Sequence, residues 1–549
     1  MKQINREAAY CCPDRAQYRA GGHVRIELHF DFGFPRVLRV QLYFLQQRIE
    51  CDWKQDGDTI DIGTPDVGNY GVAVETEAGT FETAFDVVSS VKSVVRYGFL
   101  SDFSPEDADT ADVDWLNRLH VNTVQFYDWM YRHDKLISPT EDYLDPIGRR
   151  SALSVVKKKI AACKSRGMRP FAYGAVYAAT EETFAAHPDW AAYLRDGEPM
   201  LFAGWLHYMN ISSGCGWSKH IVDEYVSAVG ALGFSGIHMD TYGFPKRIYD
   251  AQGKQVLLED AFLPLIDAAQ KAVCVADEEN GVTFNAVNDW PTEKVASGAQ
   301  DAMYIEVWPP HDTYRDLYLL IQKAKAVSGK PVVLAAYMKP FQNAKAEIEL
   351  ARAEHAFRLA NAVIMASGGF QLVHGEEKGL LCDRYYANYA SLRPEFCKTA
   401  VRYADFLVRY APLLYDDGGM DVTMTASGGI NEDVVASADG VSFSSDGRAD
   451  AVWLILRESK SRVALHLLNL TGNDANWNAG KREPKPIGNI CVRLRLDTDV
   501  KGAYTATPDG ESLCAEPLAF RTERTANGRI QTLILPKLQY YSIVWIETE

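Results

Sequence analysis

Apolar and polar residues alternate in short runs through the N-terminal part of the chain, up to about residue 92. The strictest alternation is in His23–Phe30, where every second residue is apolar. A period of two is typical of a half-buried β-strand. Similar runs, separated by Gly, Pro and Asp, cover residues 37–44, 59–62, 70–74 and 81–85. We therefore predict a small β-sandwich over residues 1–92.

From about residue 93 short apolar runs alternate with segments of helical periodicity, a pattern typical of βα units around a parallel sheet. The eight predicted strands cover residues 94–100, 123–127, 169–175, 236–240, 282–287, 302–307, 332–337 and 363–366. Eight such units predict a (β/α)8 TIM-type barrel over residues 93–414. The alternative is an open doubly wound sheet. Residues 98–103 lack the Gly-rich phosphate turn that such a sheet normally has after its first strand.

The pattern returns to β after about residue 415, with strand-like runs at 452–456, 464–468, 491–496, 532–535 and 541–546. These runs predict a C-terminal β-sandwich over residues 415–549. In the N-terminal domain, Asp66–Tyr70 is similar to the tyrosine corner of immunoglobulin-like sandwiches. We therefore expect a multidomain chain with α/β and all-β parts, in which the barrel is flanked by an N-terminal immunoglobulin-like β-sandwich and a C-terminal β-sandwich.

One connection in the predicted barrel, Ala178–Trp217, is long for a βα loop. Long loops in compact domains are usually functional. It also contains four large aromatic residues, Trp190, Tyr193, Trp205 and Tyr208. We expect this segment to form a wall or a lid on the catalytic face of the barrel.

Composition and charge limit the partners of the chain. The formal net charge of -16 argues against a nucleic-acid partner and, more weakly, against an anionic membrane. No stretch approaches a membrane span, and the N-terminus lacks the apolar core of a signal peptide. The ten cysteines form no CxxC pair, and only Cys51 falls within the expected N-terminal strands, which leaves no sandwich disulfide. A cytoplasmic chain is the simpler interpretation, and a secreted enzyme without its leader is the alternative.

Two predicted barrel strands end in a carboxylate followed by an aromatic residue. Asp240 closes the strand at 236–240, and Glu306 lies at the end of the strand at 302–307. Active sites of such barrels lie at the C-terminal ends of the strands. A helix N-cap would explain Asp240 alone equally well. Glu306 is a poor N-cap, and Trp308-Pro309-Pro310 prevents an immediate helix. Together the two carboxylates predict a catalytic pair.

Other polar and aromatic residues lie in or just after the predicted strands, and they would form a neutral, aromatic-lined face of the kind that polyols prefer. The candidates for substrate binding are Asp128, Trp129, Tyr173, Tyr177, His238, Tyr242, Asn288, Trp308, Lys339, His374 and Glu376. Lys339 could also form a Schiff base, but a solvated or sugar-binding lysine is the better interpretation. The sequence contains no HExxH motif and no cysteine cluster. We therefore expect neither a metal nor another cofactor.

Four segments resemble glycoside hydrolase family 66: VQFYDWMYRHDKL, GIHMDTYG, VTFNAVND and YIEVWPP. This family contains endo-dextranases and cycloisomaltooligosaccharide glucanotransferases. The resemblance implies that Asp240 is the nucleophile and Glu306 the general acid/base of a retaining mechanism on an α-1,6-linked glucan or isomaltooligosaccharide. Cyclising members of the family have a large carbohydrate-binding insertion near strand seven. Here only one predicted helix lies between Tyr337 and Val363.

The expected function is that of a dextranase, a retaining endo-α-1,6-glucanase. One alternative is a cycloisomaltooligosaccharide glucanotransferase that uses the same two carboxylates. The other is a non-catalytic carbohydrate-binding protein, against which both intact carboxylate motifs argue.

Overall fold

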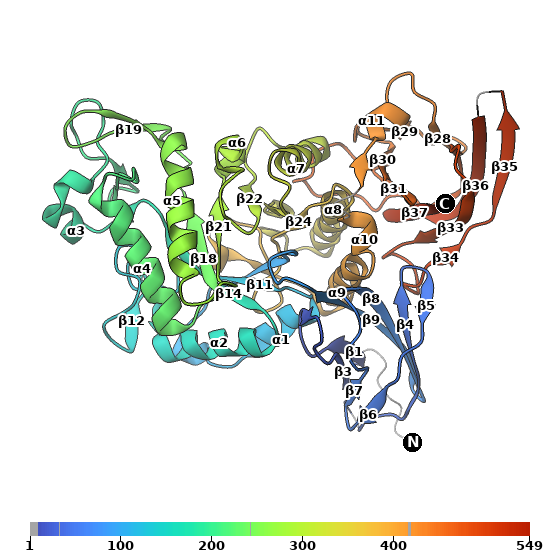
Figure 1. Cartoon of the computed structure of the whole chain (residues 1–549), viewed down its shortest axis with the longest axis horizontal. Coiled ribbons are helices and arrows are strands. Elements are labelled where there is room, and N and C mark those ends of the chain that lie inside the picture. The colour runs from blue at the N-terminus through green and yellow to red at the C-terminus, as the bar shows by residue number, and fades with distance from the viewer. Residues whose placement is uncertain (1–8, 32, 242, 416–418, 527) are drawn as a thin grey trace.

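The computed structural model describes residues 9–31, 33–241, 243–415, 419–526 and 528–549, and Figure 1 shows the whole chain. An eight-stranded parallel barrel occupies the middle of the chain, with an all-β domain on either side of it in sequence. This arrangement confirms the predicted fold class. Each of the two β-domains has a hydrophobic core of its own, and the barrel forms a third core with the helices around it.

The N-terminal domain packs two sheets against each other. One sheet has the order β1-β3-β7-β6 (Tyr10–Pro13, Arg25–His29, Thr59–Asp61, Lys54–Asp56), and the other has the order β2-β9-β8-β4-β5 (Tyr18–Arg19, Gly79–Val88, Gly68–Thr76, Val37–Phe44, Gln47–Ile49). Ile26, Val40, Val72 and Phe85 lie in the core between them. The Tyr70 hydroxyl donates to the Asp66 carbonyl at 3.0 Å, which confirms the predicted tyrosine corner.

The cysteines of this domain are placed differently from the prediction. Cys11 and Cys12 lie in β1, a strand that the sequence pattern did not reveal because it is short, does not alternate and ends in Pro13. Cys51 lies between β5 and β6, outside any strand. All ten cysteines of the chain are free thiols, so neither sheet is cross-linked to the other by a disulfide.

The barrel strands follow one another in chain order around the sheet: β10-β11-β14-β18-β21-β22-β23-β24 (Tyr97–Leu100, Thr123–Phe126, Arg169–Ala175, Gly236–Asp240, Gly281–Asn285, Met303–Glu306, Val332–Ala335, Phe370–Gln371). Every pairing is parallel, so all carboxyl ends lie at one edge. The Phe99 amide donates to the His374 carbonyl at 3.1 Å and joins the two ends of the sheet.

Helices surround this sheet in the βα order that the periodicity predicted. They are α1, α2, α4, α5, α6, α7, α8, α9 and α10 (Ala111–Arg118, Leu153–Ser165, Gly216–Leu232, Leu258–Val273, Thr292–Val295, Tyr314–Ser328, Glu347–Ala366, Pro394–Arg409, Ala411–Leu414). No helix in the described part of the chain is both long and apolar enough to span a membrane.

The eighth strand was predicted in the wrong place. Residues 363–366 form the last turn of α8, and the strand is β24, Phe370–Gln371. Every residue from Leu359 to Ala366 is buried, so this turn is as continuously apolar as a core strand. A short apolar run cannot be assigned to helix or strand from its periodicity alone. The helix ends before Gly368, which has a φ of 83°.

The long connection after β14 forms a small unit of its own. It contains a three-stranded sheet, β15-β17-β16 (Ala178–Ala179, Leu206–Tyr208, Leu201–Phe202), and helix α3 (Glu181–Ala186). Tyr193 pairs with Tyr249 of the hairpin β19-β20 (Arg247–Tyr249, Gln255–Leu257), which follows β18. Both segments start at the carboxyl ends of their strands, and Figure 1 shows α3 and β19 at the same end of the molecule.

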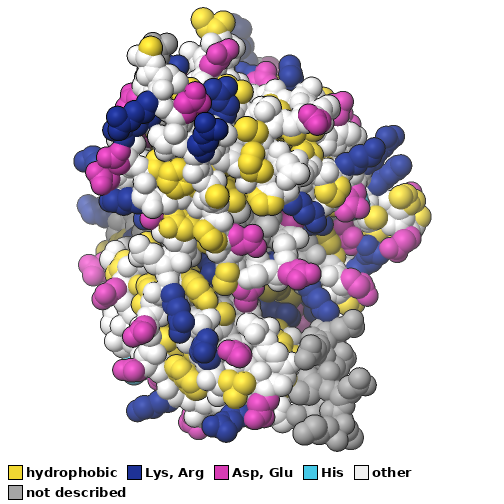
Figure 2. All heavy atoms as spheres, turned by 90° about the vertical axis from the view of Figure 1, so that its right-hand side faces the viewer, with side chains coloured by type: hydrophobic (Ala, Val, Ile, Leu, Met, Phe, Trp, Pro, Cys, Tyr) yellow, Lys and Arg dark blue, Asp and Glu magenta, His cyan; other side chains and the backbone are white. Residues whose placement is uncertain are grey.

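The C-terminal domain is a second sandwich. Its larger sheet has the order β27-β30-β31-β37-β33-β34 (Met420–Asp421, Val452–Glu458, Arg462–Asn469, Tyr541–Thr548, Val500–Ala506, Glu516–Pro517), with β29 (Phe443–Ser444) beside β30. The smaller sheet is β28-β32-β36-β35 (Val434–Ser437, Ile487–Arg495, Gly528–Leu538, Phe520–Thr525). In Figure 2, which shows the right-hand side of Figure 1, charged side chains of both signs are interspersed with small apolar groups.

Candidate active site

Asp240 and Glu306 lie at the same edge of the barrel. Asp240 is the last residue of β18, Glu306 is the last residue of β22, and only β21 lies between these two strands. Asp240 is opposite Ala175 at the end of β14, and Glu306 is opposite Ala335 at the end of β23. The parallel register therefore brings both carboxylates to the carboxyl end of the barrel, where barrel enzymes have their active sites.

The side chain of Asn285, at the end of β21, connects the two carboxylates. Its Nδ2 donates to Asp240 Oδ1 at 2.8 Å and to Glu306 Oε2 at 3.0 Å. The opposite orientation of this amide would place its carbonyl oxygen against two carboxylates. The two bridged oxygens are no farther apart than the sum of these hydrogen bonds, which is about 6 Å. One substrate atom can therefore lie within reach of both groups.

A tyrosine holds the second oxygen of each carboxylate. The Tyr173 hydroxyl, from β14, donates to Asp240 Oδ2 at 2.7 Å. The Tyr337 hydroxyl, which follows β23, donates to Glu306 Oε1 at 2.6 Å. Each carboxylate thus accepts one bond from its own tyrosine and one from the shared asparagine. Hydrogen bonds to a charged acceptor are strong and directional, so both side chains are held in one orientation.

Burial and hydrogen bonding act in opposite directions on these two groups. Burial raises the pKa of Asp240, while Tyr173 and Asn285 hold it down in part. Burial also raises the pKa of Glu306, and the nearby charge of Asp240 raises it further. The charge of an ionised Asp240 therefore favours the protonated form of Glu306. A carboxylate beside a carboxylic acid can supply a nucleophile and a proton in one cleft.

Below the carboxylates the barrel interior is filled by neutral rings. His238 is two residues before Asp240 on the same face of β18, and its Nδ1 lies 2.9 Å from the Tyr97 hydroxyl. Burial lowers the pKa of His238 to about 3, so its imidazole stays neutral. Its ring stacks against that of Tyr173, with centroids 6.1 Å apart. His238 therefore supports Tyr173 from the layer beneath and is too deeply buried to reach a substrate.

Asp128 lies just after β11 with a φ of 50°, an uncommon conformation for a residue with a side chain. It is buried, and burial raises its pKa to about 7, with the charges of Asp145 and Asp240 adding to the effect and Arg149 opposing it. Its carboxyl group has no hydrogen bond to any described residue of the chain. A strained, buried carboxyl group without a partner near Asp240 is suited to binding a hydroxyl group of a ligand.

Three other predicted substrate-binding residues lie beside the site. Tyr177 packs on Tyr208 of the long connection, with ring centroids 5.1 Å apart. Trp308 is partly exposed and meets the ring of Tyr337 edge-on at 5.7 Å. Asn288 uses its amide on the loop after β22, donating to the Pro309 carbonyl at 3.0 Å and accepting from the Trp308 amide at 3.2 Å. Tyr177 and Trp308 therefore present aromatic rings beside the candidate site, and Asn288 holds the backbone at Trp308.

Three more of the predicted residues lie away from the carboxylates. Trp129 is completely buried, packs on Phe234 and donates its indole N–H to the Tyr173 carbonyl. His374 faces Phe357 of α8, on the outer side of the barrel. Glu376 accepts hydrogen bonds from the amides of Ser101 and Asp102 and from the Ser101 hydroxyl, and so holds the loop after β10. These positions have structural roles.

Lys339 is exposed after β23, and its backbone amide donates to Asn478 Oδ1 at 3.1 Å. Tyr242 lies outside the described residues. The sequence analysis did not select Asn285 or Tyr337, although both lie within or beside predicted strands. The aromatic pair Tyr127 and Tyr386 was also missed; their rings stack at 4.4 Å. The sequence signal for Asn285 was a polar residue inside the apolar run predicted as the strand 282–287, because a buried polar side chain needs a hydrogen-bond partner.

Comparison with known proteins identifies the family of the chain. The model of glycosyl hydrolase family 66 matches residues 13–545, which is most of the 549 residues. The chain belongs to glycosyl hydrolase family 66. The resemblance noted from the strand-end motifs is thereby confirmed, and the family is one of glycosyl hydrolases.

Relatives in family 66 have two different names. A cycloisomaltooligosaccharide glucanotransferase of Niallia circulans is 25% identical over 88% of this chain and 65% of its own length. A dextranase of Streptococcus salivarius is 23% identical over 61% of this chain and 46% of its own length. The chain thus covers about two thirds of the first relative and less than half of the second.

The fold is also that of a solved family member. A Paenibacillus cycloisomaltooligosaccharide glucanotransferase, in complex with cycloisomaltoheptaose, superposes with a TM-score of 0.87 at 23% identity, covering 98% of this chain and 99% of the other. An α-amylase of Geobacillus thermoleovorans superposes with a TM-score of 0.51 at 10% identity. These likenesses show that the fold is shared.

Proposed function

We propose that this family 66 protein hydrolyses α-1,6-glucosidic linkages inside dextran or isomaltooligosaccharides by double displacement, with Asp240 as the nucleophile and Glu306 as the general acid/base. The observation that carries the proposal is the bridge that Asn285 makes between the two carboxylates. It keeps one oxygen of each carboxylate within about 6 Å of the other, which is close enough for both groups to act on the same glycosidic bond.

In the first step a carboxylate oxygen of Asp240 forms a bond to the anomeric carbon. The bond from that carbon to the leaving oxygen breaks, and the leaving oxygen takes the proton of Glu306. In the second step Glu306, now ionised, takes a proton from water while the water oxygen attacks the same carbon. The bond to Asp240 breaks, and both groups return to their starting states. Tyr173 stabilises the ionised form of Asp240, and burial keeps Glu306 protonated at the start.

The spacing of the carboxylates favours retention of anomeric configuration. In retaining enzymes the two carboxyl groups are about 5–5.5 Å apart, whereas inverting enzymes leave roughly 6.5–9.5 Å for a water molecule. The bridged oxygens of Asp240 and Glu306 are at most about 6 Å apart, because a single amide nitrogen bonds both. A nucleophilic water between them would have to displace Asn285.

Proton NMR of the first product tests the mechanism. Dextran digested for a short time should yield new reducing ends that are first in the α configuration and then mutarotate. A reducing-sugar assay in the same sample separates this proposal from a non-catalytic carbohydrate-binding protein, which would release no ends at all. A β anomer as the first product would contradict the double displacement.

Intramolecular transglycosylation is the second candidate, because the relative at 25% identity and the solved structure with a TM-score of 0.87 are both named cycloisomaltooligosaccharide glucanotransferases. One observation favours hydrolysis. The alignment with the Niallia circulans relative covers 633 positions, whereas 88% of this 549-residue chain is only about 480 residues. That relative therefore has about 150 positions inside the matched region that this chain lacks. Such an insertion could hold the far end of the sugar chain for cyclisation, so its absence here favours hydrolysis.

A further inference from the structure

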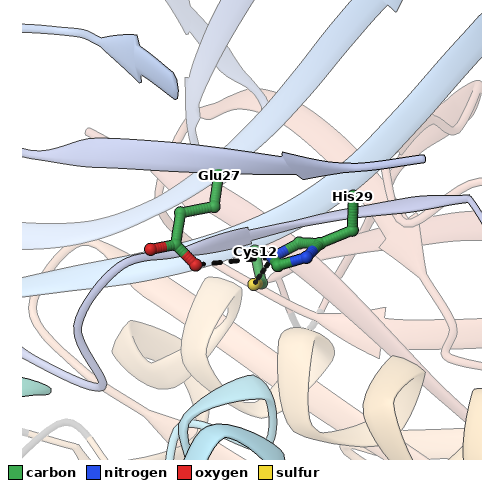
Figure 3. A group of neighbouring side chains, drawn as sticks. All are labelled: Cys12, Glu27 and His29. Atoms are coloured by element: carbon green, nitrogen blue, oxygen red, sulfur yellow. Dashed lines mark hydrogen bonds and ion pairs between the residues drawn. The ribbon is translucent and has the colours of Figure 1, made fainter. Parts of the chain in front are cut away.

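Cys12, Glu27 and His29 form a cluster on the N-terminal sandwich, away from the barrel strands. Cys12 lies on β1 and is opposite Glu27 on the neighbouring antiparallel strand β3, and His29 is two residues farther along β3. All three side chains therefore project from one face, while Cys11 and Leu28 project into the core on the other. Figure 3 shows the sulfur, the imidazole and one carboxylate oxygen turned toward a common point.

The distances in this cluster are compatible with three ligand atoms around one metal ion. The Nε2 atom of His29 lies 3.6 Å from Cys12 Sγ and 3.4 Å from Glu27 Oε2. A good N–H···O hydrogen bond is shorter, about 2.7–3.2 Å. Tetrahedral zinc has bonds of about 2.3 Å to sulfur and about 2.0–2.2 Å to nitrogen or oxygen, which place these ligand pairs about 3.6 Å and about 3.4 Å apart. The three ligand atoms all lie within 4.8 Å of one another.

We propose that Cys12, Glu27 and His29 bind one divalent transition-metal ion, with zinc as the ion that this ligand set fits best. Thiolate, imidazole and carboxylate are the ligands that zinc uses in proteins. Glu27 and His29 are partly exposed, so a water molecule completes the tetrahedron from the solvent side. The thiol proton of Cys12 leaves to solvent as the metal–sulfur bond forms.

Neighbouring groups already orient the ligands. Glu27 uses its other oxygen, Oε1, to accept from Arg166 Nη1 at 2.8 Å, which leaves Oε2 for the metal. The ring of Tyr10 stacks on the imidazole of His29, with centroids 4.4 Å apart and planes 13° from parallel. Such outer contacts fix the rotamers of metal ligands and are part of a working site. Because Arg166 follows α2, its bond to Glu27 connects the proposed metal site to the barrel domain.

A second cluster of carboxylates in the chain has its negative charge balanced by a lysine rather than by a metal ion. Asp107, Asp112 and Glu376 also lie close together, but the ammonium group of Lys159 bonds Asp107 and lies 3.8 Å from Asp112. A lysine thus provides the positive charge there. Glu27 makes its ion pair with Arg166 through Oε1, whereas its Oε2 faces His29 at 3.4 Å.

The sequence pattern did not reveal this site, because its ligands have no recognisable spacing. Glu27 and His29 are a common alternation on a strand, and Cys12 comes from a strand that was not predicted. Only the register of β1 against β3 brings them together. The inference does not depend on the proposed glucan chemistry.

Metal content and cobalt spectroscopy test the site. The full chain, purified without chelator, should contain about one zinc per molecule. After removal of zinc, Co2+ should restore one ion per chain and give a near-ultraviolet thiolate charge-transfer band with visible d–d bands of tetrahedral intensity. Cys12→Ser should lose the charge-transfer band, while Cys51→Ser, a partly buried cysteine outside the cluster, should keep it. Co2+ spectra that are the same in wild type and Cys12→Ser would overturn the site.

A second variant covers the case in which the buried Cys12 cannot be replaced without unfolding. His29→Ala changes a partly exposed residue and should lower the affinity for zinc at least tenfold in a chelator competition assay, whereas His23→Ala, on an exposed histidine of the same domain, should not. Chelation should lower the thermal midpoint of wild type and of His23→Ala but not that of His29→Ala. Equal zinc affinity in all three proteins would refute the proposal.

Discussion

At the residue scale, five side chains of the candidate site share one set of hydrogen bonds, on which the proposed chemistry depends. Asp240 and Glu306 each accept from one tyrosine and from Asn285. Asn285 bonds both carboxylates, so replacing one carboxylate also alters the hydrogen bonding of the other. Each tyrosine bonds only one of the two carboxylates, so a tyrosine variant can change the pKa of one carboxylate without removing a bond from the other.

Replacement of Asp240 by Ala should reduce dextran hydrolysis by roughly 10⁴-fold or more, the usual scale for loss of a nucleophile. The fold should survive, because the change removes a buried charge that costs free energy. Azide can enter the space left by the carboxylate and attack the anomeric carbon directly. Partial recovery of turnover on an activated substrate, with a β-glycosyl azide as product, would identify Asp240. Substantial activity without azide would exclude it as the nucleophile.

The two tyrosine hydroxyls should each control one limb of the pH–rate profile. In the proposed mechanism, activity requires Asp240 ionised and Glu306 protonated. Tyr173→Phe removes a bond to ionised Asp240, which raises the pKa of Asp240 and moves the acid limb to higher pH. Tyr337→Phe does the same to Glu306, so the alkaline limb moves to higher pH. A bond to a charged group contributes about 1.5–3 kcal/mol, which corresponds to roughly one to two pH units.

Each tyrosine variant serves as the control for the other, because both lose a phenolic hydroxyl next to the site. Glu306→Gln, which cannot ionise, should have no alkaline limb at all. The profile of kcat/KM on an activated isomaltoside measures both limbs. If Tyr173→Phe moved the alkaline limb, or Tyr337→Phe the acid limb, the roles of Asp240 and Glu306 would have to be exchanged.

At the scale of elements, two connections at the carboxyl edge of the barrel differ greatly in what they contain. The connection after β14 is long and forms the sheet β15-β17-β16, with Trp205 exposed on it and its ring 6.5 Å from that of His133. The connection from β23 to β24 is short for a site of module insertion. It contains only a single-turn 3₁₀ helix, Lys339–Phe341, and α8.

Dextran digestion should therefore yield mainly linear isomaltooligosaccharides. Forming a large ring requires the far end of the sugar chain to return to the glycosyl-enzyme, and closing a long flexible loop costs entropy. An inserted sugar-binding module would raise the effective concentration of that end, and residues 336–369 between β23 and β24 have no room for one. Mass spectrometry separates the products, because a cyclic oligomer is one water lighter than its linear counterpart. A predominance of the lighter series would show that cyclisation is the main reaction.

At the scale of the whole molecule, a buried ion pair connects the N-terminal sandwich to the barrel. Arg96, just before β10, donates to Asp86 of β9 from its two terminal guanidinium nitrogens, Nη2 at 2.9 Å and Nη1 at 3.0 Å. It also donates to the carbonyls of Ala16 and His120. Gln17 adds a bond to Asp86 at 3.0 Å. This network crosses between two hydrophobic cores, so it couples their stabilities.

Asp86→Ala should destabilise the protein by about 3–5 kcal/mol, because it leaves the Arg96 guanidinium buried without its counter-charge. Chemical denaturation followed by fluorescence measures the change. Asp52→Ala, on an exposed aspartate of the same domain, should change the stability by no more than about 0.5 kcal/mol. A small effect of Asp86→Ala would mean that the sandwich and the barrel are held together mainly by apolar contacts.

The residues at the strand ends show which features of the candidate site the amino-acid pattern can predict. Asp240 and Glu306 were identified because each interrupts an apolar run at its end, and this position alone implies the carboxyl edge of a barrel. His374 and Trp129 met the same criterion and yet face the helices and the core. Position along a strand is readable from the pattern. The direction of a side chain beyond the strand end depends on the loop that follows, which the pattern does not describe.

The sequence by itself determined the order of the three parts and the strand-end positions of Asp240 and Glu306, because a hydrophobic period of two and βα alternation are local properties of the chain. The tertiary structure alone decided that Asn285 bridges Asp240 and Glu306, that the eighth strand is Phe370–Gln371, and that Cys12 meets His29. These contacts join residues from separate strands. They depend on which strands are neighbours and in what register, and burial of the shared core sets both.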